Sequence, residues 1–266
     1  MPPFAILDWF GDNNNGRYLF EGFLTNLEIA IIAMVLAFLL GLALALLRLM
    51  RNRVVSVAAG IWVDVFRNLP LILLILFLAL LLPPSWRNGW ADNVPDWAPE
   101  AFKSGLILGA FMALILYNSA VLAEIMRAGI QSLAKGQGEA AAALGMTHRQ
   151  SLRHVILPQG LRRMVPALVG QLITLNKDTT LVSIIGIQEV VRRGRIVDNN
   201  AGNPFTGSEI EAPLLEIFLV IGMWFVIVNY ALSQLSRRLE IRERSRSGTK
   251  LERVKGLEDQ VAADPV

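Results

Sequence analysis

The stretch KGQGEAAAALGMTHRQSLRHVILPQG, Lys135–Gly160, is a charged and well-patterned segment between two apolar blocks of the chain. The alanine-rich part Glu139–Leu144 favours a helix, because alanine has the highest helix propensity. Gly145 comes directly after it and can adopt the left-handed backbone conformation that ends many helices. The first half of the stretch therefore predicts a short helix closed by a glycine.

The second half of the stretch predicts another short helix. Thr147 and Gln150 have the spacing of a capping box, in which Thr is the N-cap and Gln lies at N3. This helix is expected to run to about Ile156, because Pro158 disfavours helical backbone in the residue before it. Neither helix is long enough to be stable alone in water. The hairpin therefore needs a partner surface, or the neighbouring segments of the chain, to hold it.

Two kinds of partner surface fit such a hairpin. A basic amphipathic hairpin can lie on anionic lipid. However, the alanine run and Glu139 offer little apolar surface for lipid, and a small flat face beside one acid suits a groove on a protein better. We therefore expect a protein partner and keep the lipid surface as the alternative.

The rest of the chain is that of a polytopic membrane protein. Its 266 residues are 54% hydrophobic and 18% charged, whereas soluble domains carry about 25% charged residues. A spanning helix needs about 20 mostly apolar residues, and four uncharged runs fit: Ile29–Leu47, Asn68–Trp86, Ser104–Ala123 and Ile217–Ser236. A fifth candidate, Met164–Gln188, is interrupted by Lys177 and Asp178. The sequence therefore predicts an all-α membrane protein with about five transmembrane helices.

Two details of these runs predict local structure. The second run is expected to begin before Asn68, because Val54–Trp62 is also apolar, with Pro70 at a kink or in a first turn. Small residues lie four positions apart in the first run and again in the third, which predicts close helix packing in lipid. These residues are Ala33, Ala37, Gly41 and Ala45, followed by Gly105 and Gly109.

The basic residues predict how the chain is oriented. Lys and Arg mark cytoplasmic loops, and their distribution places the N-terminus outside and the C-terminus in the cytoplasm. Arg192, Arg193 and Arg195 run against this bias, because they fall on the outer side. We expect an extracytoplasmic segment at 1–22, a transmembrane domain at 23–237 with its loop at about 135–160, and a cytoplasmic tail at 238–266.

The chain lacks the common signatures of an active site. It has no cysteine, no G-x-x-x-x-G-K-[ST] phosphate loop, and no H-E-x-x-H zinc motif around His148 and His154. We therefore predict no catalytic residue, no metal site and no cofactor in this chain.

The hairpin resembles the EAA loop of ABC-importer permeases, whose pattern is E-A-A, three residues, G, nine residues and I-x-L-P. The residues that carry it are Glu139, Ala140, Ala141, Gly145, Val155 in place of Ile, Leu157 and Pro158. Four further segments resemble the branch for polar amino acids such as histidine, glutamine, glutamate and arginine: VFRNLPLIL (Val65–Leu73), AEIMRAGIQSLAKGQ (Ala123–Gln137), LPQGLRRMVP (Leu157–Pro166) and NKDTTLVSIIGIQEV (Asn176–Val190).

The resemblance implies a MetI-like ABC-importer permease fold with cytoplasmic coupling helices. In such importers the two short helices sit in a groove on a cytoplasmic ATPase subunit, which holds ATP and Mg. The implied docking residues are Glu139 as polar anchor, Ala140 and Ala141 for close approach, Gly145 for the bend, and Leu157 and Pro158. The resemblance also implies an extracytoplasmic substrate-binding protein, a second permease subunit (identical or homologous), a place in the bacterial inner membrane, and no nucleic-acid partner.

The implied function is that of the transmembrane subunit of an ABC importer that translocates a polar amino acid. An ATP-independent secondary transporter is the alternative, but such transporters often contain internal repeats, and the two halves of this chain show none. A membrane-surface scaffold whose hairpin binds lipid is a third class.

Several polar residues inside the apolar runs are candidates for a substrate path. Charges at membrane depth tend to face a cavity or each other, which singles out Lys177 and Asp178, followed by Thr179 and Thr180. Lys177 and Asp178 are adjacent and point in different directions on a helix, so a direct pair is the less natural alternative. Asn118 and Ser119 can bond a zwitterion, although hydrogen bonds between helices are the more common use of such residues.

Overall fold

The computed structural model describes residues 8–11, 14–50, 52–133, 135–200 and 214–246, which form helices and connections without a strand. The elements are α1 (Asp8–Gly11), α2 (Asn15–Arg48), α3 (Arg53–Asn68), α4 (Leu71–Leu81), α5 (Pro84–Asn93), α6 (Glu100–Lys103), α7 (Leu106–Gln131), α8 (Lys135–Ala143), α9 (His148–Ser151), the π-helical turn η3 (Leu152–Ile156), α10 (Leu157–Asp178), the 3-10 helix η4 (Thr179–Ile185), α11 (Val190–Asn200) and α12 (Leu214–Arg246).

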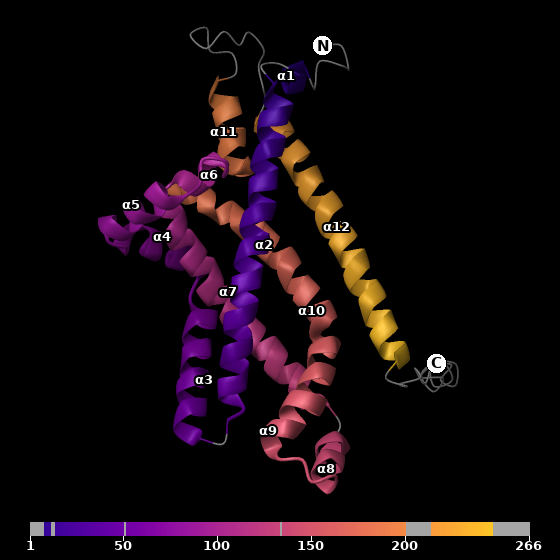
Figure 1. The fold of residues 1–266 in the computed structure, drawn as a ribbon. Helices are drawn as coiled ribbons and strands as arrows, with labels where there is room; N and C mark the ends of the chain where they lie inside the picture. Colours follow the sequence, from indigo (N-terminus) through magenta and orange to yellow (C-terminus); the bar gives the residue numbers. More distant parts are fainter. Residues whose placement is uncertain (1–7, 12–13, 51, 134, 201–213, 247–266) are drawn as a thin grey trace, which may run out of the picture.

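Four long helices, α2, α7, α10 and α12, form the body of the molecule (Figure 1). The short helices α8 and α9 lie together at one end, called the hairpin end below. Helices α1 and α11 lie at the opposite end, called the α11 end, and α5 and α6 lie in that half of the molecule. The segment quoted from the sequence is therefore presented at one end of the helical bundle.

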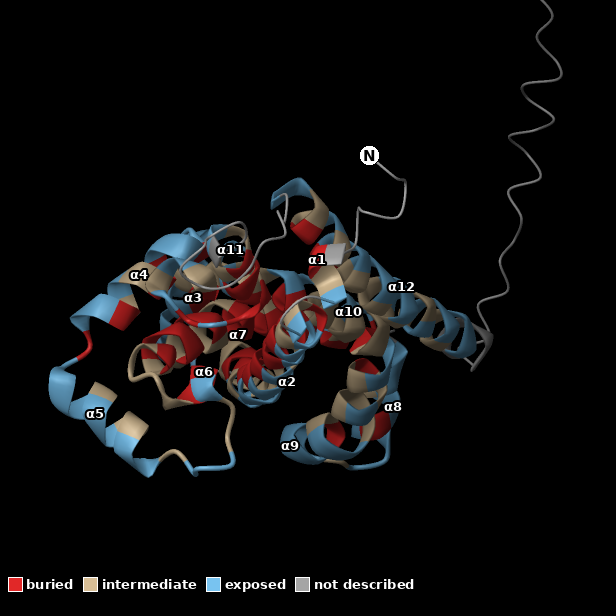
Figure 2. Cartoon of the chain, turned by 90° about the horizontal axis from the view of Figure 1, so that it is seen from above, coloured by how far each residue is buried: buried red, intermediate tan, exposed pale blue. Residues whose placement is uncertain are grey.

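Helices α2 and α7 form the centre of the packing, and small residues allow their close approach. Ala33, Ala37 and Ala45 of α2 are fully buried, and a Cβ added to Gly41 would lie 2.9 Å from the carbonyl oxygen of Ser119 on α7. The buried residues gather along α7 and the helices around it (Figure 2). The predicted stripe of small residues is therefore confirmed as a packing surface.

The second apolar run is broken by a sharp bend. Helix α3 ends at Asn68, α4 begins at Leu71, and the two helices are bent by 100°. Leu69 has extended backbone angles (φ −78°, ψ 137°) and Pro70 is the N-cap of α4, because a proline disfavours helical backbone in the residue before it. The kink predicted at Pro70 is confirmed. The run does not continue to Trp86 as one helix, since α4 ends at Leu81.

Length and composition identify three candidate spans in the described residues, α2, α7 and α12, or four if the bent pair α3–α4 is one span. Helix α10 is not among them, and it carries Lys177 and Asp178 in its last turn. It nevertheless packs against α2, α7 and α12 inside the bundle. The fifth expected span, Met164–Gln188, is not one continuous α-helix.

The chemistry of η4 explains why α10 ends at Asp178. The hydroxyls of Thr179, Thr180 and Ser183 each donate to the carbonyl three residues earlier, at 2.7, 2.8 and 2.7 Å. Hydroxyl groups that bond nearby carbonyls compete with the α-helical pattern. The chain therefore tightens into a 3-10 helix, which ends at Gly186 in the left-handed conformation (φ 84°).

Candidate docking hairpin and polar sites

The first helix of the hairpin, α8, ends in a Schellman motif. The backbone N–H of Met146 donates to the carbonyl of Ala141 at 3.1 Å, and that of Gly145 donates to Ala142 at 2.9 Å. Gly145 has a φ of 76°, which a residue with a Cβ adopts only at a cost. The predicted glycine turn is therefore confirmed.

The second helix begins with the predicted capping box. The side-chain oxygen of Thr147 accepts a hydrogen bond from the backbone N–H of Gln150 at 3.4 Å, and the Gln150 side chain accepts one from the N–H of Thr147 at 2.8 Å. Two donors that would otherwise lack a partner at the helix start are thereby satisfied. The local sequence alone explains this turn of helix.

The expected end of the second helix before Pro158 is wrong. Helix α9 passes through η3 directly into α10, whose first turn contains Pro158. The N–H of Leu157 donates to the carbonyl of Leu152, five residues back. A proline lacks the N–H and its ring clashes with the carbonyl four residues back, and the wider π-turn just before it accommodates this change. The hairpin is therefore continuous with a helix of the bundle.

The candidate docking residues divide into an exposed and an inward-facing set. Glu139, Ala140 and Gly145 are exposed, as is Pro158. Ala141 is only 3% exposed, so it packs within the chain, and Leu157 is half-buried. The surface that a partner can reach is formed by the exposed residues together with Leu144, which is 79% exposed.

Two contacts at the base of the hairpin connect it to the bundle. The side-chain amide of Gln159 donates to the side-chain oxygen of Gln137 in α8 at 3.3 Å. The guanidinium of Arg163 on α10 donates to the carbonyl of Ser132, where α7 ends just before the hairpin, at 3.0 Å. A cleft of about 240 Å³ lies between the hairpin and the ends of α2 and α7, with His148 among its lining residues. The hairpin is thus attached to the body at several points and still presents an open face.

Asn118 and Ser119 are fully buried and bonded within the protein. The Asn118 side chain accepts from Gln171 of α10 at 2.7 Å and donates to the carbonyl of Leu114 at 2.8 Å. The Ser119 hydroxyl donates to Leu116 at 2.8 Å. These contacts favour the structural alternative for both residues.

Lys177 and Asp178 lie at the end of α10 without pairing to each other in the described part of the chain. Lys177 is exposed and Asp178 is half-buried. The hydroxyl of the neighbouring Thr180 donates a hydrogen bond to the carbonyl of Lys177. Thr179, in contrast, is fully buried. The four candidate residues therefore share one segment but face different surroundings.

Thr179 belongs to a buried polar cluster that the sequence did not reveal. The side-chain amide of Asn26 on α2 donates to Thr179 at 2.9 Å and to the carboxylate of Glu189 at 3.0 Å. The amide oxygen of Asn26 accepts from the N–H of Val190 at 3.1 Å, and Glu189 accepts from that of Arg192 at 2.8 Å. Asn26, Thr179 and Glu189, called the polar cluster below, join α2, η4 and α11.

Glu189 precedes α11, outside the candidate spans, and is completely buried. Burial raises the pKa of its carboxyl to about 7, against the lowering effect of the N–H and amide donors around it. The one sequence signal that could have pointed to Glu189 is its position before a helix, because an acidic residue there accepts hydrogen bonds from the first N–H groups of the helix. No local pattern indicated Asn26 as its partner, since the two residues are far apart in sequence.

One residue of the basic trio of α11, Arg193, has a structural explanation, whereas Arg192 and Arg195 are exposed. Arg193 is only 7% exposed. Its guanidinium donates to the carbonyl of Tyr18 at 2.8 Å, lies 4.5 Å from the centre of the Tyr18 ring, and is 3.5 Å from the carboxylate of Glu21. A cation engaged in this way is part of the α2–α11 interface rather than a free charge in a loop.

The apolar helical bundle with an exposed hairpin at one end is typical of a polytopic membrane protein. The chain belongs to the family described as "Binding-protein-dependent transport system inner membrane component", whose model matches residues 24–244. It is therefore a multi-pass inner-membrane protein and a permease subunit of an ABC importer.

The chain is similar to curated proteins over nearly its whole length. It is 36% identical over 226 residues to the "Probable glutamine ABC transporter permease protein GlnP" of Bacillus subtilis, covering 85% of this chain and 94% of the relative. It is 33% identical over 235 residues to the "Glutamate/aspartate import permease protein GltK" of Escherichia coli O6:H1, covering 88% and 97%.

Solved structures agree with the fold. One described as "Crystal structure of an amino acid ABC transporter with histidines" matches with a TM-score of 0.69 and 27% identity, covering 88% of this chain and 98% of that chain. A structure of the MetNI methionine ABC transporter matches with a TM-score of 0.65 at 20% identity and supports the fold alone. The MetI-like fold is thereby confirmed, and nothing in these comparisons supports the ATP-independent transporter.

Proposed function

We propose that this chain forms the membrane part of an ATP-driven importer for a polar amino acid and that its hairpin docks on a separate ATPase subunit. The observation that carries the proposal is the exposed face of α8 and α9 at one end of a bundle of this family. The curated relatives named for glutamine and for glutamate and aspartate support the substrate class. ATP and Mg then belong to the partner, and this chain supplies no catalytic residue.

The docking face combines one charge with little steric bulk. Glu139 offers a carboxylate to a basic group of the partner, and charge-assisted hydrogen bonds are stronger than neutral ones. Ala140 has a small side chain that allows close approach, and Gly145 sets the angle between the two short helices. Leu157 and Pro158 act from the base of the hairpin, where it joins α10.

The other partners follow from the same assembly. The spanning helices of this chain are too few to enclose a translocation path on their own. A second permease subunit, identical or homologous, therefore completes the path. With the N-terminus outside, the α11 end faces an extracytoplasmic substrate-binding protein and the hairpin end faces the cytoplasm. Lys177, Asp178 and Thr180 lie near the end of α10 that faces the binding protein, where they can line the substrate path.

Charge reversal at Glu139 tests the docking proposal. In vesicles with the ATPase and binding subunits, Glu139→Lys should weaken assembly by about tenfold or more, because attraction becomes repulsion. Uptake and phosphate release should fall together or become uncoupled. The matched control is Asp92→Lys, a charge reversal on an exposed residue of α5 in the other half of the molecule. Normal coupling in Glu139→Lys would contradict the proposal and favour the lipid-surface alternative.

Gly145 tests the geometry of the turn independently of charge. A Cβ at Gly145 or at Gly136 would meet nothing within 4 Å, but only Gly145 has a positive φ. Gly145→Val should therefore distort the hairpin at a cost of about 1 to 2 kcal/mol or more, whereas Gly136→Val should be tolerated. If both variants couple hydrolysis to uptake normally, the bend at Gly145 is not needed for docking.

A further inference from the structure

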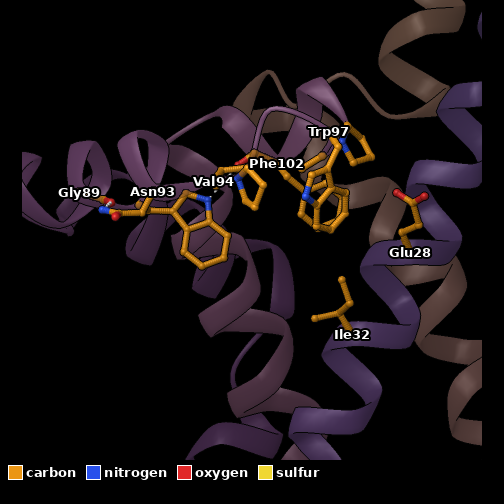
Figure 3. Close-up of a pocket in the computed structure, with 11 residues that line it drawn as sticks. Glu28, Ile32, Gly89, Asn93, Val94, Trp97 and Phe102 are labelled. Carbon is orange, nitrogen blue, oxygen red and sulfur yellow. Dashed lines mark hydrogen bonds between the residues drawn. The ribbon is translucent and has the colours of Figure 1, made fainter.

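A cavity of about 550 Å³ opens between α2 and the segment that carries α5 and α6. Its walls are mostly apolar and aromatic, and Figure 3 shows Glu28 and Ile32 of α2 facing Trp97 and Phe102 across it. Its size lies in the range of small-molecule sites, which is roughly 300 to 1,000 Å³. Nothing in the proposed transport function uses this cavity.

The position of Glu28 along α2 places the cavity at a membrane surface. Arg48 follows Glu28 by 20 residues on the same helix, and Ile29–Leu47 between them carries no charge. At 1.5 Å per residue this separation is about 30 Å, which equals the thickness of the hydrocarbon core. Arg48 pairs with Glu124 at one boundary, so Glu28 lies at the headgroup level of the opposite leaflet.

Glu28 differs from the other carboxylates of α2 and α7, Glu21 and Glu124, because it has no cation beside it. Glu21 pairs with Arg17 and Arg193, and Glu124 pairs with Arg48 and Arg127. Among the residues that the structure describes, no Lys or Arg lies within 4.0 Å of the Glu28 carboxylate. Glu28 is also the one charged side chain that lines the cavity. The site is therefore complementary to a cation that comes from elsewhere.

The aromatic walls add a second attraction for a cation. Trp90 is held in place, because its indole N–H donates to the carbonyl of Phe102 at 2.9 Å and its ring packs against Phe111 at 6.1 Å. Trp97 is 86% exposed although it lines the cavity. An ammonium group over an indole face is attracted by the ring quadrupole, and tryptophan favours the headgroup layer.

The surface of α2 beside the cavity indicates what else the ligand carries. Ile32 lines the cavity and is followed on the same exposed stripe by Val35, Leu36 and Leu39, which are 55%, 44% and 59% exposed. This apolar stripe runs from the cavity toward the membrane centre. A ligand with a cationic head and an apolar tail matches both parts.

We propose that the cavity binds a phosphatidylethanolamine molecule of the leaflet at the α11 end. Its ammonium group pairs with the Glu28 carboxylate and lies against the Trp97 ring, and one acyl chain follows the stripe from Ile32 to Leu39. A free amino acid offers the ammonium without the tail. Phosphatidylglycerol has the tail and the phosphate but no ammonium group to pair with Glu28. The lipid fastens the α5–α6 segment to α2.

The test measures lipid preference in the full-length protein. The chain is reconstituted in nanodiscs of phosphatidylglycerol that contain increasing fractions of phosphatidylethanolamine with brominated acyl chains, and quenching of tryptophan fluorescence and retained lipid in native mass spectra are recorded. The wild type should retain phosphatidylethanolamine in preference to phosphatidylglycerol. Glu28→Gln should reduce that preference roughly threefold to tenfold, while Asp92→Asn, on the same side but outside the lining, should not.

Four outcomes would overturn the proposal. The first is an equal affinity of the wild type for both lipids. The second is an unchanged preference in Glu28→Gln when its thermal midpoint matches that of the wild type. The third is efficient cross-linking of Trp97→Cys between two chains by a short bifunctional maleimide, which would show that a second copy covers the cavity. The fourth is displacement of the brominated lipid by millimolar ethanolamine with the same efficiency as by unlabelled phosphatidylethanolamine, which would refute the need for an acyl chain.

Discussion

Glu189 gives the sharpest physical test of the structure, because its carboxyl is buried between α2, η4 and α11. Its pKa is raised from 4.5 to about 7. The folded protein therefore holds this proton more tightly than the unfolded chain, so protonation stabilises the fold. The contribution is fully present below about pH 4.5 and is lost as the pH rises through about 7. At about 1.4 kcal/mol per pH unit, the shift corresponds to about 3 kcal/mol.

The variant Glu189→Gln removes the titration but keeps the size of the side chain. One amide hydrogen of Gln would face a donor, either Asn26 or the N–H of Arg192, and this mismatch should cost about 1 to 2 kcal/mol at any pH. The stability difference between wild type and variant should therefore be largest at low pH and should shrink as the pH rises. Asp92→Asn, an exposed position, should show no such trend.

Thermal unfolding of the purified full-length chain in detergent, followed by tryptophan fluorescence from pH 4.5 to 8.5, measures this difference. The midpoint difference between wild type and Glu189→Gln should fall by roughly 6 to 12 °C over that range. Ionisable groups other than Glu189 are the same in both proteins, so their contributions to the midpoint difference cancel. A difference that stays constant with pH, or grows as the pH rises, would refute the burial argument.

Two further predictions concern topology and the substrate path. Cysteine at Asp92 should react with an impermeant maleimide from outside, and cysteine at Gln150 only after the membrane is opened; the reverse pattern would invert the proposed orientation. Lys177→Gln and Asp178→Asn should each lower uptake in reconstituted vesicles while the complex with the ATPase subunit still assembles; loss of the complex without a separable transport effect would favour a structural role.

The hairpin was predictable from sequence because local chemistry determines it. Gly145 ends α8 for conformational reasons that depend on one residue, and Thr147 and Gln150 satisfy each other's backbone groups within one turn. The same holds for the kink at Pro70, where the proline acts on its immediate neighbour. No long-range contact is needed to form these features, which explains why they could be predicted and agree with the structure.

The junction at Pro158 and the polar cluster were not predictable in the same way. A proline gives a preference for a helix end, but the continuous packing of α9, η3 and α10 overrides it through one π-turn. The partners Asn26 and Glu189 are 163 residues apart in sequence, so only the folded arrangement of α2 and α11 brings them together. Each residue alone is an ordinary polar side chain next to an apolar run.

These two unpredicted features lie at the two ends of the same helix, and this has a mechanical consequence. Helix α10 runs from η3, at the base of the hairpin, to η4, whose Thr179 belongs to the polar cluster, and it contains Pro166 in its interior. Its 22 residues span about 33 Å. A hydrogen-bonded helix changes length very little, so a shift of the hairpin must move η4, bend α10, or open the π-turn. The Asn26–Glu189 contacts resist the first response and the packing of α10 on α2, α7 and α12 resists the second. Between the hairpin and the polar cluster, η3 and Pro166 are therefore the two places where α10 can adjust at least cost. The turn of η3 is already wider than that of an α-helix, and the proline removes one hydrogen bond of the helix.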